Sequence, residues 1–360
     1  MRSNGKGWVK SKMELMIGKK KVGPGRPVFI IAEAGVNHNG SLKEAFRLVE
    51  AAKAAGADAV KFQTYRTEEL VTADAPKAAY QQKNTRAGSQ FEMLKRLELS
   101  EADFKKLFDH CRQRKILFLS SPFDGPSAVF LDRLGVAAFK ISSSELTNHL
   151  LLAQVAGCGK PVILSTGMAS LAEVRSAVKV IFSAGNRKLI LLHCTSNYPT
   201  AAGDVNLRAM KTLADEFALP AGFSDHTEGI AVSIAAAALG AAVLEKHFTL
   251  DKKAAGPDHQ ASLDPVELGA LVRAVRQVEA ALGDGRKRPT VSELPVRAVA
   301  RKSIVAAADL EPGTKLSTAL LKLKRPGTGL APELLPKLVG RIAKAAIAKD
   351  EMITWRKVAR

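Results

Sequence analysis

Two histidines in the second half of the sequence each follow a short apolar run. His226 comes directly after AGFSD, and His247 comes directly after AVLEK. Neutral imidazole is a common ligand of divalent ions such as Mn²⁺, Fe²⁺ or Zn²⁺, and two histidines without a third protein ligand leave positions open for water or substrate. If the two runs are neighbouring strands, His226 and His247 predict a catalytic metal site.

Lys246, directly before His247, allows a different chemistry. A desolvated lysine inside a barrel can form an imine with pyruvate, as in a Schiff-base aldolase. We interpret His247 as the ligand and Lys246 as a residue that is not the nucleophile. A carbohydrate-binding protein without catalytic activity is a third possibility. Other histidines in predicted loops or strand ends stay open as alternative ligands, namely His38, His193 and His259.

Two further lysines stand directly after apolar residues. Lys61 follows DAV and Lys140 follows AF, and serines end several of the other runs. Lysine point charges and hydroxyl donors are the groups that bind phosphate and carboxylate. The pattern therefore predicts a pocket for an anionic substrate. Its candidate serines are Ser121, Ser143, Ser165, Ser196 and Ser224.

The elements that position these residues alternate along the chain. Between about Val28 and Gly283, short β-branched runs and longer helical patterns form eight strand–helix pairs. This length and order predict an α/β fold, a (β/α)8 TIM barrel, whose active site lies at the C-terminal ends of its strands. Four residues stand where helix N-caps belong, namely Ser41, Ser100, Ser170 and Asp264.

The sequence divides into four predicted segments: a hairpin segment over residues 1–26, the barrel over 27–283, a polar linker over 284–296 and a small domain over 297–360. A domain of this size has a small core, so we expect it to dock on another surface. The stretch from Arg66 to Gln90 is long for a barrel loop, which predicts a lid or a substrate-facing insertion.

Composition excludes several classes of protein. The net charge is +19, but the excess lies near the two ends and no basic stripe carries interleaved aromatic residues, so we expect no nucleic-acid partner. No run is long enough to cross a membrane, no signal peptide is recognisable, and we expect a cytoplasmic protein without a membrane partner. The three cysteines have neither disulfide nor zinc-site spacing.

Ten ordered motifs give a more specific indication. They are IIAEAGVNHNG, VKFQT, FLSSPFD, KISSSE, ILSTGM, HCTSNYPT, GFSDHT, LEKHFT, GPDHQAS and LKRPGTG. From about residue 28 onward the chain resembles the sialic acid synthase (N-acetylneuraminate synthase) family. The resemblance implies a TIM barrel followed by a small antifreeze-like domain of the β-clip type. It implies a transferase that joins phosphoenolpyruvate to N-acetylmannosamine and water and releases phosphate.

The resemblance also implies roles for individual residues. His226 and His247 would hold a divalent ion, Mn²⁺, and Glu33 or Asp258 would orient the attacking water or move protons. Arg325, from the small domain, would reach the N-acyl group across a domain-swapped homodimer. Phosphoenolpyruvate would be bound by Lys61, Ser121, Lys140, Ser143, Ser165, Ser196 and Ser224. The open-chain sugar would contact Glu33, Gln63, Glu145, Tyr198 and Asp258.

The acceptor sugar is left open between relatives. Members of the family make N-acetylneuraminate, legionaminate or pseudaminate from different N-acyl sugars. We expect N-acetylmannosamine, with a 2,4-diacetamido trideoxy hexose as the alternative. The motifs APKAAYQ and GPDHQAS resemble the neuraminate and legionaminate members more than the pseudaminate members.

Overall fold

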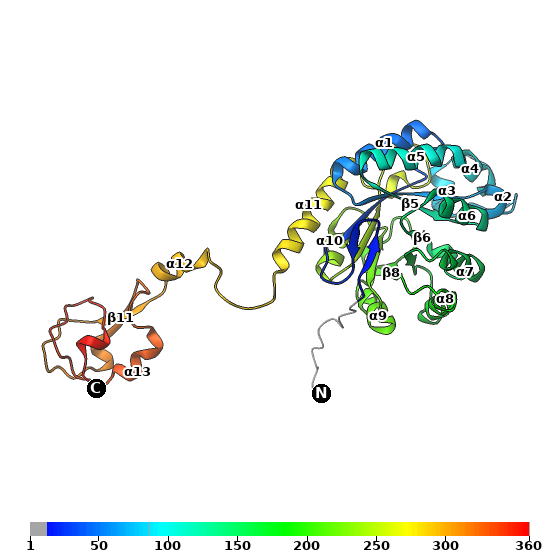
Figure 1. Cartoon of the computed structure of the whole chain (residues 1–360). Helices are drawn as coiled ribbons and strands as arrows, with labels where there is room; N and C mark the ends of the chain where they lie inside the picture. Colours follow the sequence, from blue (N-terminus) through cyan, green and yellow to red (C-terminus); the bar gives the residue numbers. More distant parts are fainter. Residues whose placement is uncertain (1–12, 86, 360) are drawn as a thin grey trace. The chain divides into compact units, whose positions relative to one another are not determined.

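The computed structural model describes residues 13–85 and 87–359. The chain forms two compact units, and the boundary between them in the sequence lies between Gly283 and Asp284 (Figure 1). Residues 1–12, which belong to the predicted hairpin segment 1–26, lie outside the described residues. The first unit holds the strands and helices predicted as a barrel. The second unit holds the predicted small domain.

The first unit is built around a parallel sheet of eight strands in its described part. The strand order is β5-β4-β3-β10-β9-β8-β7-β6, and the two outermost strands, β5 and β6, also lie next to each other, so the sheet is nearly closed into a barrel. The predicted TIM barrel is confirmed. The strands are β3 (Phe29–Gly35), β4 (Ala59–Thr64), β5 (Leu117–Pro122), β6 (Phe139–Ile141), β7 (Val162–Ser165), β8 (Leu189–Cys194), β9 (Ala221–Asp225) and β10 (Val243–His247).

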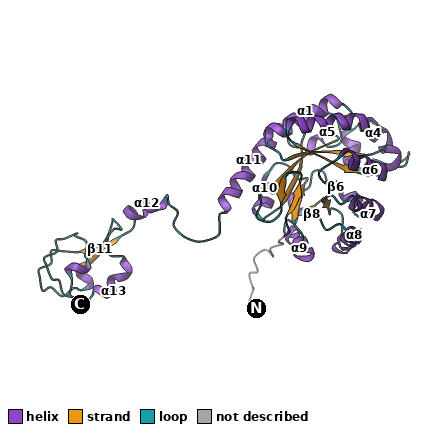
Figure 2. Ribbon diagram, in the orientation of Figure 1, coloured by secondary structure: helices purple, strands orange, loops and turns teal. Residues whose placement is uncertain are grey.

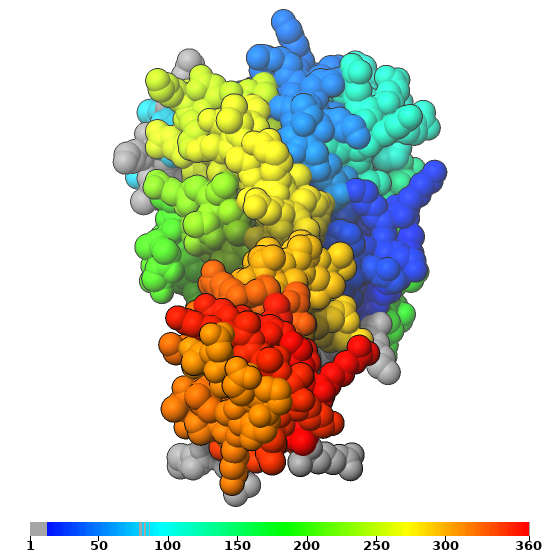
Figure 3. Space-filling model, turned by 90° about the vertical axis from the view of Figure 1, so that its left-hand side faces the viewer, coloured from blue at the N-terminus to red at the C-terminus, as the bar shows by residue number. Residues whose placement is uncertain are grey.

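Helices surround these strands, as Figure 2 shows in purple around orange. The predicted N-caps are confirmed, because each of the four side chains accepts a hydrogen bond from a backbone N–H in the first turn. In Figure 3 the side chains of α1 and α11 lie side by side on the outer surface. The helices are α1 (Leu42–Ala55), α5 (Glu101–Arg114), α6 (Gly125–Leu134), α7 (His149–Gly157), α8 (Leu171–Ser183), α9 (Arg208–Phe217), α10 (Ala231–Ala238) and α11 (Pro265–Leu282).

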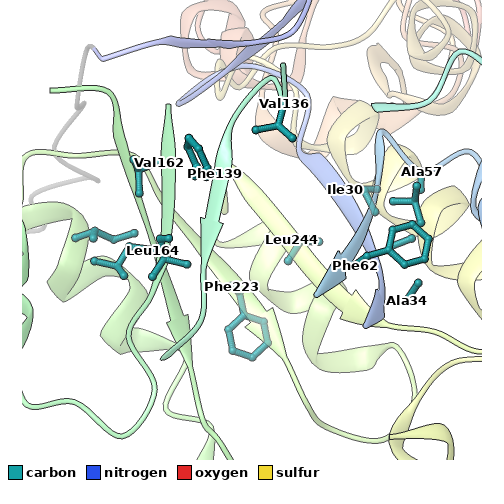
Figure 4. Packing of buried hydrophobic residues seen from close by; sticks show 14 of the residues in the cluster. Ile30, Ala34, Ala57, Phe62, Val136, Phe139, Val162, Leu164, Phe223 and Leu244 are labelled. Atoms are coloured by element: carbon teal, nitrogen blue, oxygen red, sulfur yellow. The ribbon is translucent and has the colours of Figure 1, made fainter. Parts of the chain in front are cut away.

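Side chains of each strand alternate between the barrel interior and the helix layer. On β3, Ile30 faces outward and joins the large apolar cluster between strands and helices, whereas Phe29 and Ile31 join a separate interior cluster. Figure 4 shows part of the outer cluster, with Ile30 and Phe62 of neighbouring strands beside Ala57. This alternation decides which residues near a strand end can face the mouth of the barrel.

A hairpin closes the opposite end of the barrel. Its strands, β1 (Leu15–Ile17) and β2 (Lys20–Val22), pair in antiparallel fashion. Leu15, Ile17 and Val22 are buried in the same cluster as the interior residues Phe29 and Ile31. In the described part of the chain, the amino-terminal ends of the strands are therefore covered by apolar packing, and the interior is left to open at the carboxyl ends.

The segment between β4 and α5 contains the predicted insertion Arg66–Gln90 and extends beyond it. In its described residues it forms three short helices, α2 (Thr67–Leu70), α3 (Ala79–Asn84) and α4 (Gln90–Leu97), and the whole segment is called the insertion below. Met93 and Leu97 of α4 are buried with Val36 and Tyr65 in a small apolar cluster. The insertion is thus attached to the loops that follow β3 and β4, at the carboxyl ends of the strands.

The second unit has its own apolar core. It contains α12 (Glu293–Ala300), β11 (Ser303–Ala306), β12 (Leu321–Lys324) and α13 (Leu335–Leu338), and β11 pairs with β12 in antiparallel fashion. Helix α12 crosses the predicted boundary between linker and small domain at residues 296 and 297. The core consists of Ile304, Ala306, Leu310, Leu316, Leu321, Leu338, Ala343, Ile347, Ile353 and Val358. None of the described helices of either unit combines the length and apolar character needed to cross a membrane.

Asp58, just before β4, ties several elements together at the amino-terminal end of the barrel. Its carboxylate accepts a hydrogen bond from the N–H of Ile30 at 2.8 Å and pairs with Arg276 of α11 at 3.1 Å. Lys20 of the hairpin also pairs with it. The side chain of Asp58 is buried, so these donors replace water around the charge.

We expect Asp58→Ala to lower the free energy of unfolding by about 2 kcal/mol, because a buried N–H and two cations lose their acceptor. Urea unfolding measures this change. Asp109→Ala is the matched control, since Asp109 forms an exposed pair with Arg112 on the surface of α5 and its loss should cost less than about 0.5 kcal/mol. Equal losses in the two variants would contradict the role given to Asp58.

Candidate active site

A cavity of about 590 Å³ opens at the carboxyl ends of the strands. Its lining joins residues from every barrel strand or the loop behind it, together with residues of the insertion. The candidate residues that it brings together are Glu33, Lys61, Gln63, Ser121, Lys140, Ser143, Glu145, Ser165, Ser196, Tyr198, Ser224, His226, His247 and Asp258. Arg325 belongs to the second unit, where it follows β12.

Four charged side chains meet at the base of this cavity. Lys61 Nζ lies 2.7 Å from Glu33 Oε2 and 3.9 Å from Glu245 Oε2, and Lys140 Nζ lies 3.2 Å from Glu245 Oε1. Each of the four side chains is at most 5% exposed. The cluster is balanced, with two cations and two carboxylates, which is the condition under which charges tolerate burial.

Burial and ion pairing shift the pKa values of these groups in opposite directions. Burial raises the pKa of Glu33 to about 7, although Lys61 opposes the shift. Burial also disfavours charge on Glu245, but Lys140 and Lys61 outweigh it and hold the pKa of Glu245 below its usual value. For Lys140 burial prevails over the attraction of Glu245 and lowers the pKa. Glu33 is thus the member of the cluster poised to exchange a proton near neutral pH.

The predicted serines lie around the two lysines. Ser121 Oγ accepts a hydrogen bond from Lys61 Nζ at 3.1 Å, and Ser143 Oγ accepts one from the N–H of Gly167 at 2.9 Å. Ser165 Oγ is buried and has no hydrogen-bond partner among the described residues. A Cβ at position 167 would stand 2.3 Å from Ser196 Oγ and 2.9 Å from Ser143 Oγ, so these hydroxyl groups lie where they do because residue 167 has no side chain. The arrangement leaves hydroxyl groups available for an anionic ligand.

His226 and His247 stand next to each other, with ring centroids 5.4 Å apart. His226 Nδ1 lies 2.8 Å from the carbonyl oxygen of Thr195, so Nδ1 carries a proton and donates it to that oxygen. Burial disfavours charge on His226, but the contacts with Cys194 and Thr195 outweigh it and raise the pKa of this imidazole, so an ion at Nε2 would compete with a proton. His247 Nδ1 is buried without a hydrogen-bond partner among the described residues. Burial, followed by the positive charges around it, lowers the pKa of His247 well below its usual value, so this imidazole is neutral.

These features fit a divalent ion. A neutral imidazole with an unsatisfied buried nitrogen and a second imidazole oriented by a carbonyl group are the donors that transition-metal ions use. Among the described residues, no group of three or more His, Cys, Asp or Glu side chains is arranged to hold a metal. An ion held here would have the two histidines as protein ligands and would complete its coordination with water or substrate.

Two carboxylates in the cavity differ in their surroundings. Glu33 contacts Lys61 and accepts a hydrogen bond from Gln63 Nε2 at 3.4 Å. In the described part of the chain, the carboxylate of Asp258 makes no such contact. Burial raises the pKa of Asp258 to about 6, against the positive charge of His226 and Lys61. Both groups can therefore change protonation near neutral pH, and Asp258 is the less constrained.

The alternative histidine ligands lie outside the cavity lining. His193 Nε2 is 2.6 Å from the carbonyl oxygen of Val205, and His259 Nδ1 is 2.6 Å from Thr249 Oγ1. His38 Nδ1 accepts a hydrogen bond from the N–H of Gly40 at 3.1 Å. Each of these imidazoles is thus engaged in fixing loops of the protein.

Lys246 also stays outside the cavity. It is 1% exposed and pairs with Asp225 at 3.0 Å on the outer face of β10, because it alternates with Glu245 and His247, which face inward. A small molecule in the cavity cannot reach its amino group. This position agrees with the interpretation that Lys246 is not a nucleophile.

No role was predicted for some of the residues that line the cavity. Glu245 is the second carboxylate of the charge cluster, and its spacing of two residues from His247 could have revealed it. Cys194, at the end of β8, lies 3.7 Å from His226 Nδ1. Side chains of the insertion and of neighbouring loops form an apolar wall of the cavity. No sequence motif predicted this wall. It consists of Val36, Leu70, Val71, Met93, Leu94, Leu97 and Phe123.

His38 makes stability depend on pH. Burial lowers its pKa to about 4, and the positive field of His259 adds to this shift, whereas the unfolded chain should have a value near 6.5. Between these values the unfolded state binds the extra proton. Stability is therefore complete above pH 6.5 and falls as the pH drops toward 4.

We expect His38→Asn, which keeps an acceptor for the N–H of Gly40, to reduce this dependence. The loss of unfolding free energy between pH 6.5 and pH 5 should be smaller than in the wild type by about 2 kcal/mol. Urea unfolding at the two pH values measures the difference. An unchanged pH dependence in the variant would show that His38 is not the responsible group.

Comparison with known proteins agrees with this geometry. Residues 48–287 match the NeuB family, and residues 301–359 match the SAF domain, which is the antifreeze-like domain. The chain is 48% identical to an N,N'-diacetyllegionaminic acid synthase of Legionella pneumophila, over 95% of this chain and 97% of the relative. It is 45% identical to the enzyme of that name from Campylobacter jejuni, over 91% of this chain and 99% of the relative.

A solved structure has the same architecture. It is the N-acetylneuraminic acid (sialic acid) synthetase from Leptospira borgpetersenii, which is 37% identical, with a TM-score of 0.71, and the match covers 79% of this chain and 95% of that one. The barrel, the small domain after it and the long matches to relatives lead to one assignment. The chain belongs to the NeuB family and carries a SAF domain after its barrel.

Proposed function

We propose that this protein condenses phosphoenolpyruvate with a 2,4-diacetamido trideoxy hexose and water to give a legionaminate-type nonulosonic acid and phosphate. The observation that carries the proposal is the meeting of two buried lysines and two adjacent imidazoles in one cavity. The lysines suit an anionic phosphoenol substrate, and the imidazoles suit an ion that binds a sugar oxygen.

Phosphoenolpyruvate carries a phosphate and a carboxylate, and the base of the cavity offers partners for both. Lys61 and Lys140 supply cations, and the hydroxyl groups of Ser121, Ser143 and Ser165 supply donors. The N–H of Gly167, now bonded to Ser143, is a further donor at the same place. Since the lysines are already desolvated, their attraction for an anion is stronger than in water.

We propose that a divalent ion, Mn²⁺, is held by His226 and His247. The support is the buried, unsatisfied nitrogen of His247 and the orientation of His226 by the carbonyl of Thr195. When bound, such an ion withdraws electron density from the carbonyl group of the acceptor and makes its carbon more electrophilic.

In the condensation, C3 of phosphoenolpyruvate forms a bond to the aldehyde carbon of the open-chain sugar. Water adds at C2, and phosphate leaves by cleavage of the C–O bond. The residues of the chain hold the two substrates in contact and exclude bulk water from the base of the cavity, where the side chains are buried. Tyr198, which lies against His226 with ring centroids 4.2 Å apart, covers one side of this space.

Water attack at C2 requires a group that accepts a proton. Glu33 is held by Lys61 at 2.7 Å, whereas the carboxylate of Asp258 is unconstrained among the described residues and its pKa is raised to about 6. We therefore assign the proton transfer to Asp258 and assign to Glu33, with Gln63 and Glu145, the binding of sugar hydroxyl or amide groups. Both carboxylates line the same cavity.

The choice of acceptor follows from the relatives and from the apolar wall. The sequence alone favoured N-acetylmannosamine, but the two legionaminic acid synthases share more identical residues with this chain than the sialic acid synthetase does. A trideoxy sugar with two acetamido groups carries more methyl surface than N-acetylmannosamine. The wall formed by Leu70, Val71, Met93 and Leu97 suits that surface.

We further propose that the enzyme works as a domain-swapped homodimer in the cytoplasm. In this arrangement the partner's Arg325 contacts the N-acyl group of the acceptor. The proposal rests on the family resemblance and on the separate apolar core of the second unit, which allows that unit to fold as a body of its own.

Phosphate release with two acceptors tests the proposed substrate. We expect kcat/KM for the 2,4-diacetamido trideoxy hexose to exceed that for N-acetylmannosamine by at least about tenfold, because one methyl group in an apolar pocket is worth about 10- to 200-fold in discrimination. Leu97→Asn should reduce the preference by making the wall polar. Equal or greater activity with N-acetylmannosamine would favour a sialic acid synthase.

Removal of the ion or of a ligand should stop the reaction without unfolding the chain. We expect EDTA, or His226→Ala, to lower phosphate release by at least about 100-fold, since a metal-polarised carbonyl has no substitute among the lining residues. Circular dichroism checks that the fold persists, and added Mn²⁺ should restore the EDTA-treated enzyme but not the variant. Full activity of metal-free protein would refute the metal assignment.

The competing Schiff-base aldolase makes a different prediction. Its lysine would have to be Lys61 or Lys140, because Lys246 is outside the cavity, and the lowered pKa of Lys140 favours it over Lys61. We expect no covalent adduct after treatment with pyruvate and borohydride, because both lysines are paired with buried carboxylates. Mass spectrometry detects the adduct, and its presence on Lys140 would support the aldolase.

A further inference from the structure

Asp225 and Lys246 form an ion pair that the proposed reaction does not use. Asp225 Oδ2 lies 3.0 Å from Lys246 Nζ, and the two side chains are 0% and 1% exposed. Neither residue lines the cavity. The pair lies between the strands β9 and β10 and the helix layer outside them.

The register of these strands gives the pair its position. Asp225 and Lys246 are direct partners on neighbouring parallel strands. The preceding partners, Ser224 and Glu245, face the cavity and are joined by a hydrogen bond of 3.0 Å. His226 and His247 directly follow the ion pair along the two strands. Because side chains alternate, the pair holds the strands together on one face while both imidazoles project from the other.

The contacts of the pair converge on the backbone around His226. Asp225 Oδ1 accepts hydrogen bonds from both the N–H and the hydroxyl of Thr227, each at 2.8 Å. Lys246 donates to the carbonyl oxygen of Thr227, and Ser233 of α10 donates to Asp225 Oδ2. The residues on both sides of His226 are therefore fixed by a strand and a helix.

An ion pair is an unusual choice for this layer. The previous outward-facing partners on the same strands, Phe223 and Leu244, are apolar and buried in the main cluster. A buried ion pair adds little stability compared with apolar residues of similar volume, because desolvation opposes the attraction. Its directional hydrogen bonds, by contrast, restrict geometry in a way that apolar packing does not.

We propose that Asp225 and Lys246 are positioning residues that set the separation of His226 and His247 for a divalent cation. The inference rests on the metal site of the proposed function. It assigns to Lys246 a task in metal binding from outside the cavity, through the strand that carries His247. It assigns to Asp225 the corresponding task for His226.

Two measurements on the full chain test the proposal. Electron paramagnetic resonance of the free ion gives the Kd for Mn²⁺, and thermal unfolding gives the Tm. The double variant Asp225→Asn/Lys246→Met removes both charges and keeps similar shapes. We expect its Tm to stay near that of the wild type. Its Kd for Mn²⁺ should rise by about 10- to 100-fold, which is the usual loss when residues behind metal ligands are changed.

Two single variants complete the test. Ser233→Ala removes the contact from α10 while leaving both charges, and it should raise the Kd in the same direction by a smaller factor. Asp58→Asn is the control: it disturbs a buried carboxylate with basic partners at the other end of the barrel. It should lower Tm and leave the Kd unchanged. Should the double variant fail to fold, Ser233→Ala decides the question.

The outcomes separate this inference from the proposed function. If wild-type Mn²⁺ binding is lost in His226→Ala but retained at full affinity in the double variant and in Ser233→Ala, the ion pair has a structural role only and the inference is wrong. If His226→Ala binds Mn²⁺ as the wild type does, the metal site itself is wrong, and that result overturns both proposals.

Discussion

The mouth of the barrel depends on the mutual neutralisation of four buried charges. Lys61, Lys140, Glu33 and Glu245 come from four different strands, and none of them could be buried alone without a large desolvation cost. These ion pairs hold the two lysine side chains in a fixed orientation and out of contact with water before a ligand binds. An anionic substrate therefore encounters cations that have already lost their water, and the protein needs little rearrangement to receive it.

The topology of the barrel explains why many residues of the candidate site could be predicted from the sequence. A (β/α)8 barrel brings the ends of all eight strands to one place, so residues far apart in the chain, such as Glu33 and His226, become neighbours once the strand–helix alternation is recognised. The period of two along a strand then decides which of them face inward. Lys140 and Ser224 were proposed from their places at the ends of apolar runs, and both line the cavity.

Other features required the three-dimensional structure. The apolar wall depends on how Met93 and Leu97 of the insertion pack onto loops after β3 and β4, and these contacts join distant segments. Helix α12 has no buried residue, so no apolar stripe predicted a helix across the boundary between the linker and the small domain. The partners of Lys246 were also hidden, because an ion pair in the helix layer departs from the apolar pattern of the neighbouring positions.

The closure of the sheet has a consequence for the synthesis of this protein. The first barrel strand, β3, pairs on one side with β10, whose last residue is His247. Until that residue has left the ribosome, the edge of β3 is an unpaired row of N–H and C=O groups on a hydrophobic strand. Such an edge invites association with other chains. The edge of β3 is therefore covered only after the last strand of the barrel has been made and has paired with it.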